Sequence, residues 1–367
     1  MRASSARFRA LLRLPQFMRN LLLIVLCLLL VGFIALGITK CGKSGNHSGG
    51  GIALTGASPT AQYTLMKESV IGFDGSYARA YNTKTGDLLW ECSPDGGQGY
   101  KCAVSSGLVV LYKAASMSVY TEEGKIAFTL SPEKSIERVS AGLTRIAVCY
   151  TDNTIEIFDS TGKSVETLTP DGGQIMDHAF YSSSDLLWVL SLDNSGIRPK
   201  STVSIHQPGK MLIASFSTSD QCYFRPVISG SNVYLIGGDT IDFRNTDTTA
   251  ENSALVKGWS HIDTYMDDAV SLLFSLTEQG ENGTTLRVFT GEKSHDVHMH
   301  IGCSDLMLGD LYVYGFSGNI VYALPISGGK TVTASLPCTV SSLLCRISGS
   351  RALVTDGTSV MLVNLPG

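Results

Sequence analysis

Residues 80–90 read AYNTKTGDLLW and complete the alternating stretch SVIGFDGSYARA. Asn82 and the Thr-Gly pair that ends at Gly86 are turn formers, and a glycine takes a positive φ without steric cost. Ala80 is small enough for neighbouring sheets to approach closely, and the flat ring of Trp90 can pack between them. The segment therefore predicts two strands joined by a tight turn, in a fold built from closely packed sheets.

The same alternation of strand-forming and polar residues recurs along the chain. Val, Ile, Tyr and Phe stand between clusters of Gly, Asn, Asp and Ser, which is the pattern of short β-strands. Beyond the N-terminus, no long segment has convincing 3.6-residue periodicity. We therefore expect an all-β fold, from stretches such as SVIGFDG (69–75), RIAVCYT (145–151), TIEIFDS (154–160), NVYLIGG (232–238) and NIVYALP (319–325).

The strand–turn–strand unit repeats with a period of roughly 40 residues, the length of a four-stranded propeller blade. The longest interval, from 162 to 291, has room for two further turns, near Pro208-Gly209 and near residues 245–252. Successive turn glycines are otherwise separated by 38 residues, and they are Gly86, Gly124, Gly162, Gly291 and Gly329. The spacing predicts a β-propeller.

The C-terminal residues bear on the number of blades. One further period after Gly329 ends at Gly367, so an eighth unit would lack its outer strand. Sheet proteins avoid open strand edges, and residues 52–57, IALTGA, can supply the missing strand. We therefore predict eight blades over residues 52–367, closed by strand 52–57 pairing into the last blade. Seven blades is the alternative, because the turns near 209 and 249 are poorly defined.

The segment at residues 80–90 also carries a family resemblance. It resembles the repeat of the quinoprotein (PQQ-like) β-propeller superfamily, roughly Ala-x-Asp/Asn-x-x-Thr-Gly-x-x-x-Trp, through Ala80, Asn82, Thr85, Gly86 and Trp90. A second copy keeps Asp159, Thr161 and Gly162 but has Leu168 near the position of the Trp. The chain also resembles uncharacterised bacterial single-pass membrane proteins with a PQQ-like propeller ectodomain. The resemblance implies a blade type and no particular activity.

Residues 21–38, LLLIVLCLLLVGFIALGI, contain no charged residue and would span about 27 Å as a helix. Five arginines precede them, which predicts that residues 1–20 form a cytoplasmic basic arm and that the propeller is extracytoplasmic. Residues 39–51 form a Gly/Ser-rich tether. We therefore predict a single-pass protein of the cell membrane.

Two other interpretations of the N-terminus stay open. A signal peptide could be cleaved after Ala35-Leu36-Gly37, although the apolar run exceeds the usual length of such peptides. An Arg- and Ser-rich start without acids also suits a mitochondrial transit peptide. Lipoprotein processing is disfavoured, because Cys41 follows Lys40, where a small residue is expected.

The charge distribution argues against nucleic acid as a partner. The formal net charge is −4, but residues 1–43 hold seven basic residues and no acid. The rest of the chain has 21 basic against 32 acidic residues, a net charge of −11. Nucleic-acid binding needs clustered Lys and Arg to replace counterions, which such a surface does not offer.

The sequence offers little support for a cofactor. Quinoprotein alcohol dehydrogenases typically carry two adjacent cysteines beside the quinone, and this chain has no Cys-Cys pair. It has no C-x-x-C either, and no acidic cluster typical of a Ca²⁺ site. Cys92 and Cys102 either form a local disulfide across a Gly-rich connection or stay reduced. We therefore expect no cofactor.

One histidine cluster, SHDVHMH, is the strongest candidate for metal chemistry. On a strand, His298 and His300 point to the same face and could share a metal with a nearby carboxylate, whereas His295 and Asp296 flank them. The alternative, which we favour, is a polar outer strand of the sixth blade. We assign no metal and no catalytic residue.

The favoured function is a non-enzymatic binding or scaffold module for envelope proteins, wall polymers or a small ligand. The alternative is an extracytoplasmic enzyme acting on sugars or wall material at the central channel. Candidate carboxylates on inner strands are Glu137, Asp263, Asp267 and Asp268. A third possibility, a sensor, would need a partner helix, since the arm before the membrane has about 20 residues. An enzyme predicts converging titratable groups, and a scaffold predicts an exposed apolar patch.

Overall fold

The computed structural model describes residues 50–95, 97–170, 173–181, 185–249, 251–267, 269–276 and 283–367. The described residues belong to one compact unit, Ser48–Gly367. The predicted arm, the membrane segment at 21–38 and all of the tether except its last two residues lie outside the described residues. Within the described ranges, no helix has the length and apolarity that a membrane span requires.

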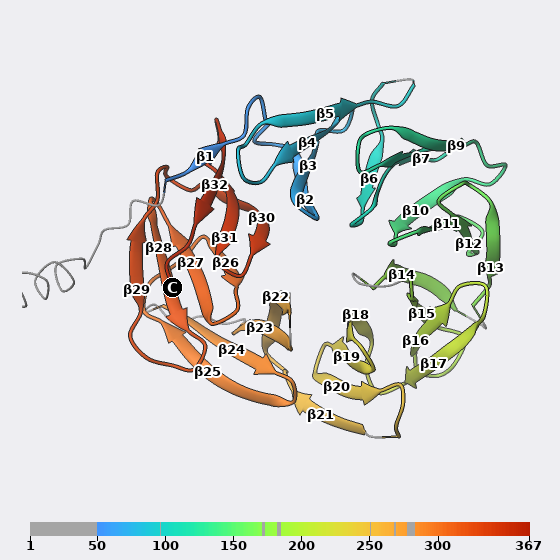
Figure 1. The fold of residues 1–367 in the computed structure, drawn as a ribbon. Helices are drawn as coiled ribbons and strands as arrows, with labels where there is room; N and C mark the ends of the chain where they lie inside the picture. Colours follow the sequence, from blue (N-terminus) through green and yellow to red (C-terminus); the bar gives the residue numbers. More distant parts are fainter. Residues whose placement is uncertain are drawn as a thin grey trace, which may run out of the picture. The chain divides into compact units, whose positions relative to one another are not determined.

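The Ser48–Gly367 unit is a β-propeller with eight blades, each a four-stranded sheet (Figure 1). This confirms the all-β class and eight blades rather than seven. Blades 1 to 4 consist of β2 (Gln62–Met66), β3 (Ser69–Phe73), β4 (Ala78–Asn82) and β5 (Leu88–Cys92); β6 (Lys101–Val104), β7 (Leu108–Lys113), β8 (Ser116–Thr121) and β9 (Ile126–Leu130); β10 (Ile136–Ala141), β11 (Arg145–Tyr150), β12 (Ile155–Asp159) and β13 (Ser164–Leu168); and β14 (Gln174–Phe180), β15 (Leu187–Asp193), β16 (Lys200–Gln207) and β17 (Met211–Thr218).

The other four blades follow the same order along the chain, except that the last one takes its fourth strand from the N-terminal side. They consist of β18 (Tyr223–Ser229), β19 (Asn232–Gly237), β20 (Thr240–Asn245) and β21 (Glu251–Leu255); β22 (Trp259–Met266), β23 (Val270–Leu276), β24 (Thr284–Thr290) and β25 (Lys293–Met299); β26 (Asp305–Leu308), β27 (Tyr312–Ser317), β28 (Ile320–Pro325) and β29 (Val332–Ser335); and β30 (Ser342–Ser348), β31 (Arg351–Thr355), β32 (Val360–Asn364) and β1 (Ile52–Ala53).

The ring closes between its first and last strands. β1 pairs antiparallel with β32, with Ile52 opposite Leu362 and Ala53 opposite Met361. The strand is shorter than the expected 52–57, because the chain turns after Leu54. The Ala57 amide donates to the Leu54 carbonyl at 3.3 Å within that turn.

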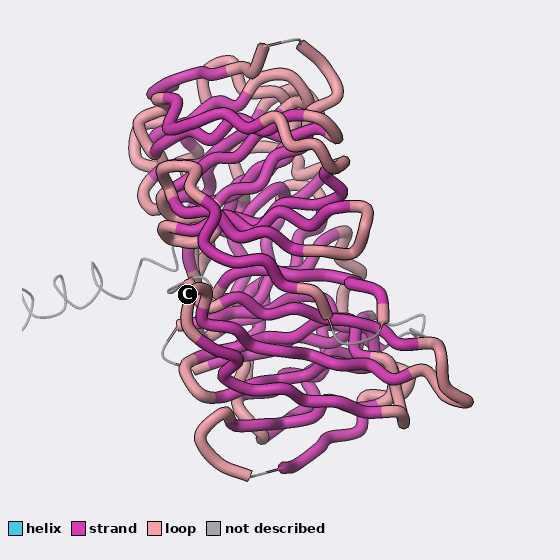
Figure 2. Tube along the Cα trace, turned by 90° about the vertical axis from the view of Figure 1, so that its right-hand side faces the viewer, coloured by secondary structure: helices cyan, strands magenta, loops and turns pink. Residues whose placement is uncertain are grey.

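The core lies between the blades, whose sheets stack face to face (Figure 2). Neighbouring blades cover both faces of a middle strand, which explains why some strands are continuous apolar runs rather than alternating ones. In β7, LVVLYK, and β11, RIAVCY, five residues of six are buried. One cluster joins blades 2 and 3 through Val110, Val119, Ile146 and Val148, all fully buried.

The turn at residues 82–87 is built as the sequence suggests. The Asn82 side-chain oxygen accepts hydrogen bonds from the backbone amides of Lys84 at 2.7 Å and Thr85 at 3.2 Å. The Gly86 amide donates to the Asn82 carbonyl at 2.9 Å, and Gly86 has a φ of 78°. The Thr85 hydroxyl accepts a bond from the amide of Asp87 at 3.4 Å.

Trp90 joins blade 1 to blade 2. It pairs with the fully buried Ala80 across β4 and β5, and its indole nitrogen donates to the Glu122 carbonyl of the next blade at 2.8 Å. A Cβ added to Gly124 would lie 2.6 Å from the Trp90 ring, so only glycine allows this approach. The same contact recurs at two other pairs of adjacent blades: Phe128 against Gly162, and Ile52 against Gly86.

Candidate functional site

The inner strands of blades 3, 4, 5, 6 and 8 share one irregularity. Each has a break in its pairing register with the second strand of its blade, and one residue is left over at the break. Bulges of this kind interrupt exposed strand edges and re-aim side chains. The left-over residues are Glu137, Met176, Phe224, Ile262 and Leu344, and a second break in blade 8 leaves Ile347.

Three of these bulge residues expose large apolar side chains. Met176, Phe224 and Ile262 are 45%, 51% and 42% exposed, and they occupy the same position in three consecutive blades, 4, 5 and 6. We call them the apolar row. Their strands, β14, β18 and β22, are the innermost of their blades and surround the centre of the ring (Figure 1).

Charged residues follow the bulges and form ion pairs between blades. Arg138 donates to the Asp177 carboxylate at 2.7 Å and to the Met176 carbonyl at 2.5 Å. Arg346, from blade 8, pairs with Asp263 of blade 6 and donates to the Thr264 carbonyl at 2.7 Å. These carboxylates are neutralised by arginine and stabilise the packing of the inner strands.

The carboxylates proposed for an enzyme do not converge. Asp263 is held by Arg346 and by the backbone amide of Leu308 at 2.8 Å. Glu137 lines a small cavity beside Asp152, whereas Asp267 lines a different one, between blades 6 and 7. Asp268 lies outside the described residues. The three proposed carboxylates that the structure describes therefore do not share one cavity.

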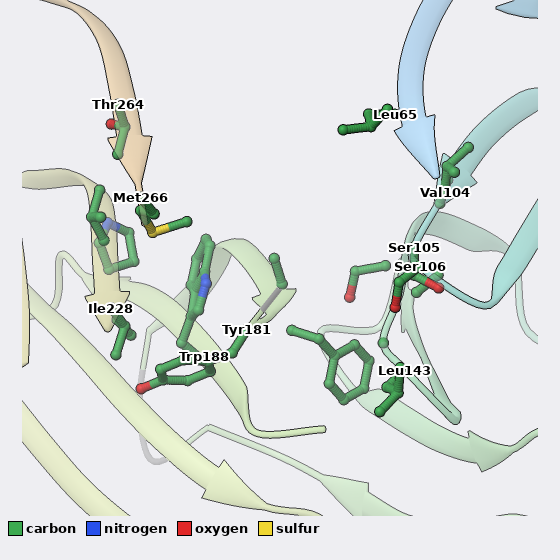
Figure 3. Close-up of a pocket in the computed structure, with 18 of the residues that line it drawn as sticks. Leu65, Val104, Ser105, Ser106, Leu143, Tyr181, Trp188, Ile228, Thr264 and Met266 are labelled. Atoms are coloured by element: carbon green, nitrogen blue, oxygen red, sulfur yellow. The ribbon is translucent and has the colours of Figure 1, made fainter. Parts of the chain in front are cut away.

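A cavity of about 690 Å³ lies among the inner strands of blades 1 to 6 (Figure 3). Its wall includes Trp188, Tyr181 and Met266, with Leu65 and Val104 across from them. The cavity falls within the usual size range of small-ligand sites. Among its lining residues, the charged side chains are Lys67 and Arg225, and none carries a carboxylate.

A serine–histidine pair lies beside this cavity. Ser140 Oγ and His178 Nδ1 are hydrogen-bonded at 2.8 Å, and Ser140 lines the cavity. His178 is only 2% exposed, and burial, followed by the charge of Arg138, lowers its pKa to about 3. An imidazole that resists protonation so strongly is a poor general base. We therefore interpret the hydrogen bond between Ser140 and His178 as a structural contact between β10 and β14.

The histidine cluster lies on β25, the outer strand of blade 6. The rings of His298 and His300 are 4.6 Å apart, and Thr285 hydrogen-bonds His298 at 3.2 Å. Arg287 donates hydrogen bonds to both carboxylate oxygens of Asp296, at 2.6 and 2.9 Å. His295 forms a hydrogen bond with a backbone carbonyl of blade 7. In the described part of the chain, no group of three His, Cys, Asp or Glu residues could hold a metal.

Cys92 and Cys102 are free thiols that face the core cluster between blades 1 and 2. Burial, followed by a neighbouring charge in each case, raises the pKa of both thiols to about 12. Thiols this difficult to ionise are poor nucleophiles and poor metal ligands. Of the two alternatives for Cys92 and Cys102, a disulfide or two reduced thiols, the structure has the reduced thiols.

Comparison with solved structures supports the fold. Similar structures include the WD40 domain of SCAP from fission yeast, at 12% identity and a TM-score of 0.61, covering 87% of this chain and 99% of that one. BamB from Moraxella catarrhalis has 10% identity and a TM-score of 0.53, covering 86% and 98%. The computationally designed Ika8 protein has 14% identity and a TM-score of 0.58, covering 86% and 99%. At such identities the likeness establishes the propeller fold alone.

The scan against protein-family models and the search of curated proteins found no match to this chain. The chain is thus a β-propeller that is similar in fold to the WD40 domain of SCAP and to BamB.

Proposed function

We propose that this protein is a membrane-anchored, extracytoplasmic propeller that binds a protein partner of the cell envelope. The apolar row carries the proposal. Exposed apolar patches on folded proteins commonly mark surfaces that a partner covers. Here Met176, Phe224 and Ile262 are each more than two-fifths exposed at equivalent positions of adjacent blades.

The partner would contact the row with a narrow element. The row stands on inner strands, so a loop or a chain terminus fits this position better than a flat surface. Phe224 has the largest exposed fraction of the three and lies on the middle blade. Aromatic side chains near the centre of an interface commonly contribute most of the binding energy.

The N-terminal sequence supports the proposed location. Residues 21–38 are long and apolar enough to span a bilayer, and the five arginines before them favour a cytoplasmic N-terminus. The Gly/Ser-rich residues of the tether, 39–51, would let the propeller move above the membrane.

The blade type is also part of the proposal. The Asn82–Gly86 turn and the contact of Trp90 with Gly124 support assignment of blade 1 to the PQQ-like superfamily. The partly matching turn of blade 3 supports it too, because Asp159 accepts bonds from the amides of Thr161 and Lys163.

A pull-down of the full chain from its own membranes tests the proposal. The test variant replaces all three residues of the row with glutamine. The matched control replaces three apolar residues exposed on outer strands, Leu88, Ile126 and Met211. We expect one set of envelope proteins with wild type and with the control variant, and its loss with the row variant. Equal recovery from both variants would rule out the row as the binding site.

A further inference from the structure

We propose that the cavity among blades 1 to 6 binds a small organic anion, with one carboxylate on an aromatic or acyl body. This ligand is separate from the protein partner, because the cavity and the apolar row consist of different residues. Three features of the cavity lead to this chemistry: one uncompensated cation, an apolar wall and the absence of acids among the lining residues.

The cation is Arg225, on the inner strand of blade 5. The inner strands on either side carry carboxylates, but Arg138 holds Asp177 and Arg346 holds Asp263. In the described structure, no side chain forms an ion pair with Arg225, an exposed residue of the cavity lining. Among the described residues, the adjacent blades therefore leave one positive charge without a counter-ion.

The other charges around the cavity do not compensate Arg225. Lys67, the second cation of the lining, pairs with Glu122. His261, on the neighbouring strand β22, bonds Thr264 at 3.0 Å. Burial, followed by the Arg225 charge, lowers the pKa of His261 to about 4, so this imidazole is neutral near pH 7. The site is thus locally positive within a domain of net charge −11.

The wall supplies the surface for an apolar ligand body. Trp188 and Tyr181 lie together on one side with Met266, and Leu143 lies across the cavity (Figure 3). Aromatic side chains provide much of the contact area in such sites, and a few polar groups fix the orientation. The hydroxyls of Ser105 and Ser106 line the far wall and can hydrogen-bond a ligand.

This combination selects among ligand classes. A metal ion or an organic cation would meet Arg225 with no carboxylate in the lining to hold it. A neutral sugar would leave the guanidinium uncompensated. A single carboxylate matches a single guanidinium, which binds it through two parallel hydrogen bonds. One unpaired arginine therefore fits a ligand with one anionic group.

Dansylglycine is a suitable probe, because it joins an aromatic body to one carboxylate and is soluble in water. Dansylglycinamide is the matched neutral compound. Binding to the full-length chain in nanodiscs is measured from dansyl emission and from energy transfer out of tryptophan. We expect dansylglycine to bind about tenfold more tightly than the amide, as a charge-assisted hydrogen bond predicts.

Variants assign the binding to this cavity. Arg225→Gln should reduce the ratio of the affinities for dansylglycine and dansylglycinamide to nearly one. Arg225→Lys should restore most of this ratio, because the positive charge returns. Arg198→Gln is the control, since it removes an equal charge from an arginine side chain that is 73% exposed. Trp188→Phe should remove the nearest energy donor and leave dansyl binding measurable.

Thermal denaturation checks that each variant is folded. Equal affinity for the two probes, an unchanged preference in a folded Arg225→Gln, or undiminished energy transfer in Trp188→Phe would overturn the proposal. In the pull-down from membranes, Arg225→Gln should still recover the protein partner. A failure of the anion proposal is therefore distinguishable from a failure of the proposed binding at the apolar row.

Discussion

Trp90 illustrates how single residues join the blades. Its ring lies on Gly124 and its indole nitrogen bonds the Glu122 carbonyl, so one side chain both packs and hydrogen-bonds across the boundary. Gly124 is required twice, for a φ of 74° and for the close approach of the ring. The pattern at residues 80–90 predicts this packing, because its Ala, turn residues and Trp all act within one hairpin.

Gly124→Ala should therefore destabilise the protein more than Gly75→Ala. Gly75 also has a positive φ, 95°, but a Cβ there would meet no atom within 4 Å. We expect a loss of roughly 1–2 kcal/mol for Gly75→Ala from backbone strain. Gly124→Ala should lose about 1–3 kcal/mol more, because Trp90 must move. Denaturant unfolding followed by circular dichroism measures both, and equal losses would refute the packing role.

His178 should make stability depend on pH. The folded pKa is lowered to about 3, against 6.5 for the free side chain, so the unfolded chain binds the proton more readily. Stability from this residue is complete above pH 6.5 and falls as the pH drops toward 3, by about 2–3 kcal/mol between pH 7 and 4.5. His178→Asn should flatten the unfolding free energy over this range. An unchanged slope would show that the imidazole is not buried in the folded state.

At the scale of strands, the sequence predicts the features that depend on local residues and does not predict those that depend on distant ones. The turn glycines mark the connection between third and fourth strands, because glycine at a positive φ is a local requirement. The bulges have no such signal, since none of their residues is glycine: they are Glu137, Met176, Phe224, Ile262, Leu344 and Ile347. The pairing of Arg346 with Asp263 is equally difficult to predict, because the two residues are 83 positions apart in the chain.

Cysteine crosslinking tests the pairing of β1 with β32. Ala53 and Met361 are direct partners in the antiparallel register, a separation that a disulfide can bridge. Ala53→Cys with Met361→Cys should form a disulfide under mild oxidation, identified by peptide mass spectrometry. Ala53→Cys with Leu362→Cys is the control, because residue 362 points to the opposite face. Equal yields from the two pairs would contradict the register.

At the scale of the molecule, the recurring spacing of 38 residues predicts the number of blades, even though the first strands of successive blades begin between 35 and 49 residues apart. The cavity cannot be predicted from the repeat spacing. Its wall comes from six blades between Leu65 and Met266, so no short segment contains its pattern. The ion pair of Asp263 escapes prediction for the same reason, since Arg346 reaches it from blade 8.

The proposed location predicts the labelling of Cys222, which is exposed, whereas the other described cysteines are at least partly buried. In a Cys41→Ser background, which removes the cysteine of the predicted tether, a membrane-impermeant maleimide should label the protein in intact cells, and Cys222→Ser should remove most of that labelling. Labelling only after lysis would place the propeller on the cytoplasmic side.

The measurement that tests the central claim most directly is site-specific photo-crosslinking in native membranes. A photoreactive amino acid replaces Phe224 in the apolar row, or Ile126, which is 63% exposed on an outer strand. Crosslinking of one envelope protein from position 224 and not from 126 is the predicted result. No product from position 224, or the same products from both positions, would contradict a partner bound at the row.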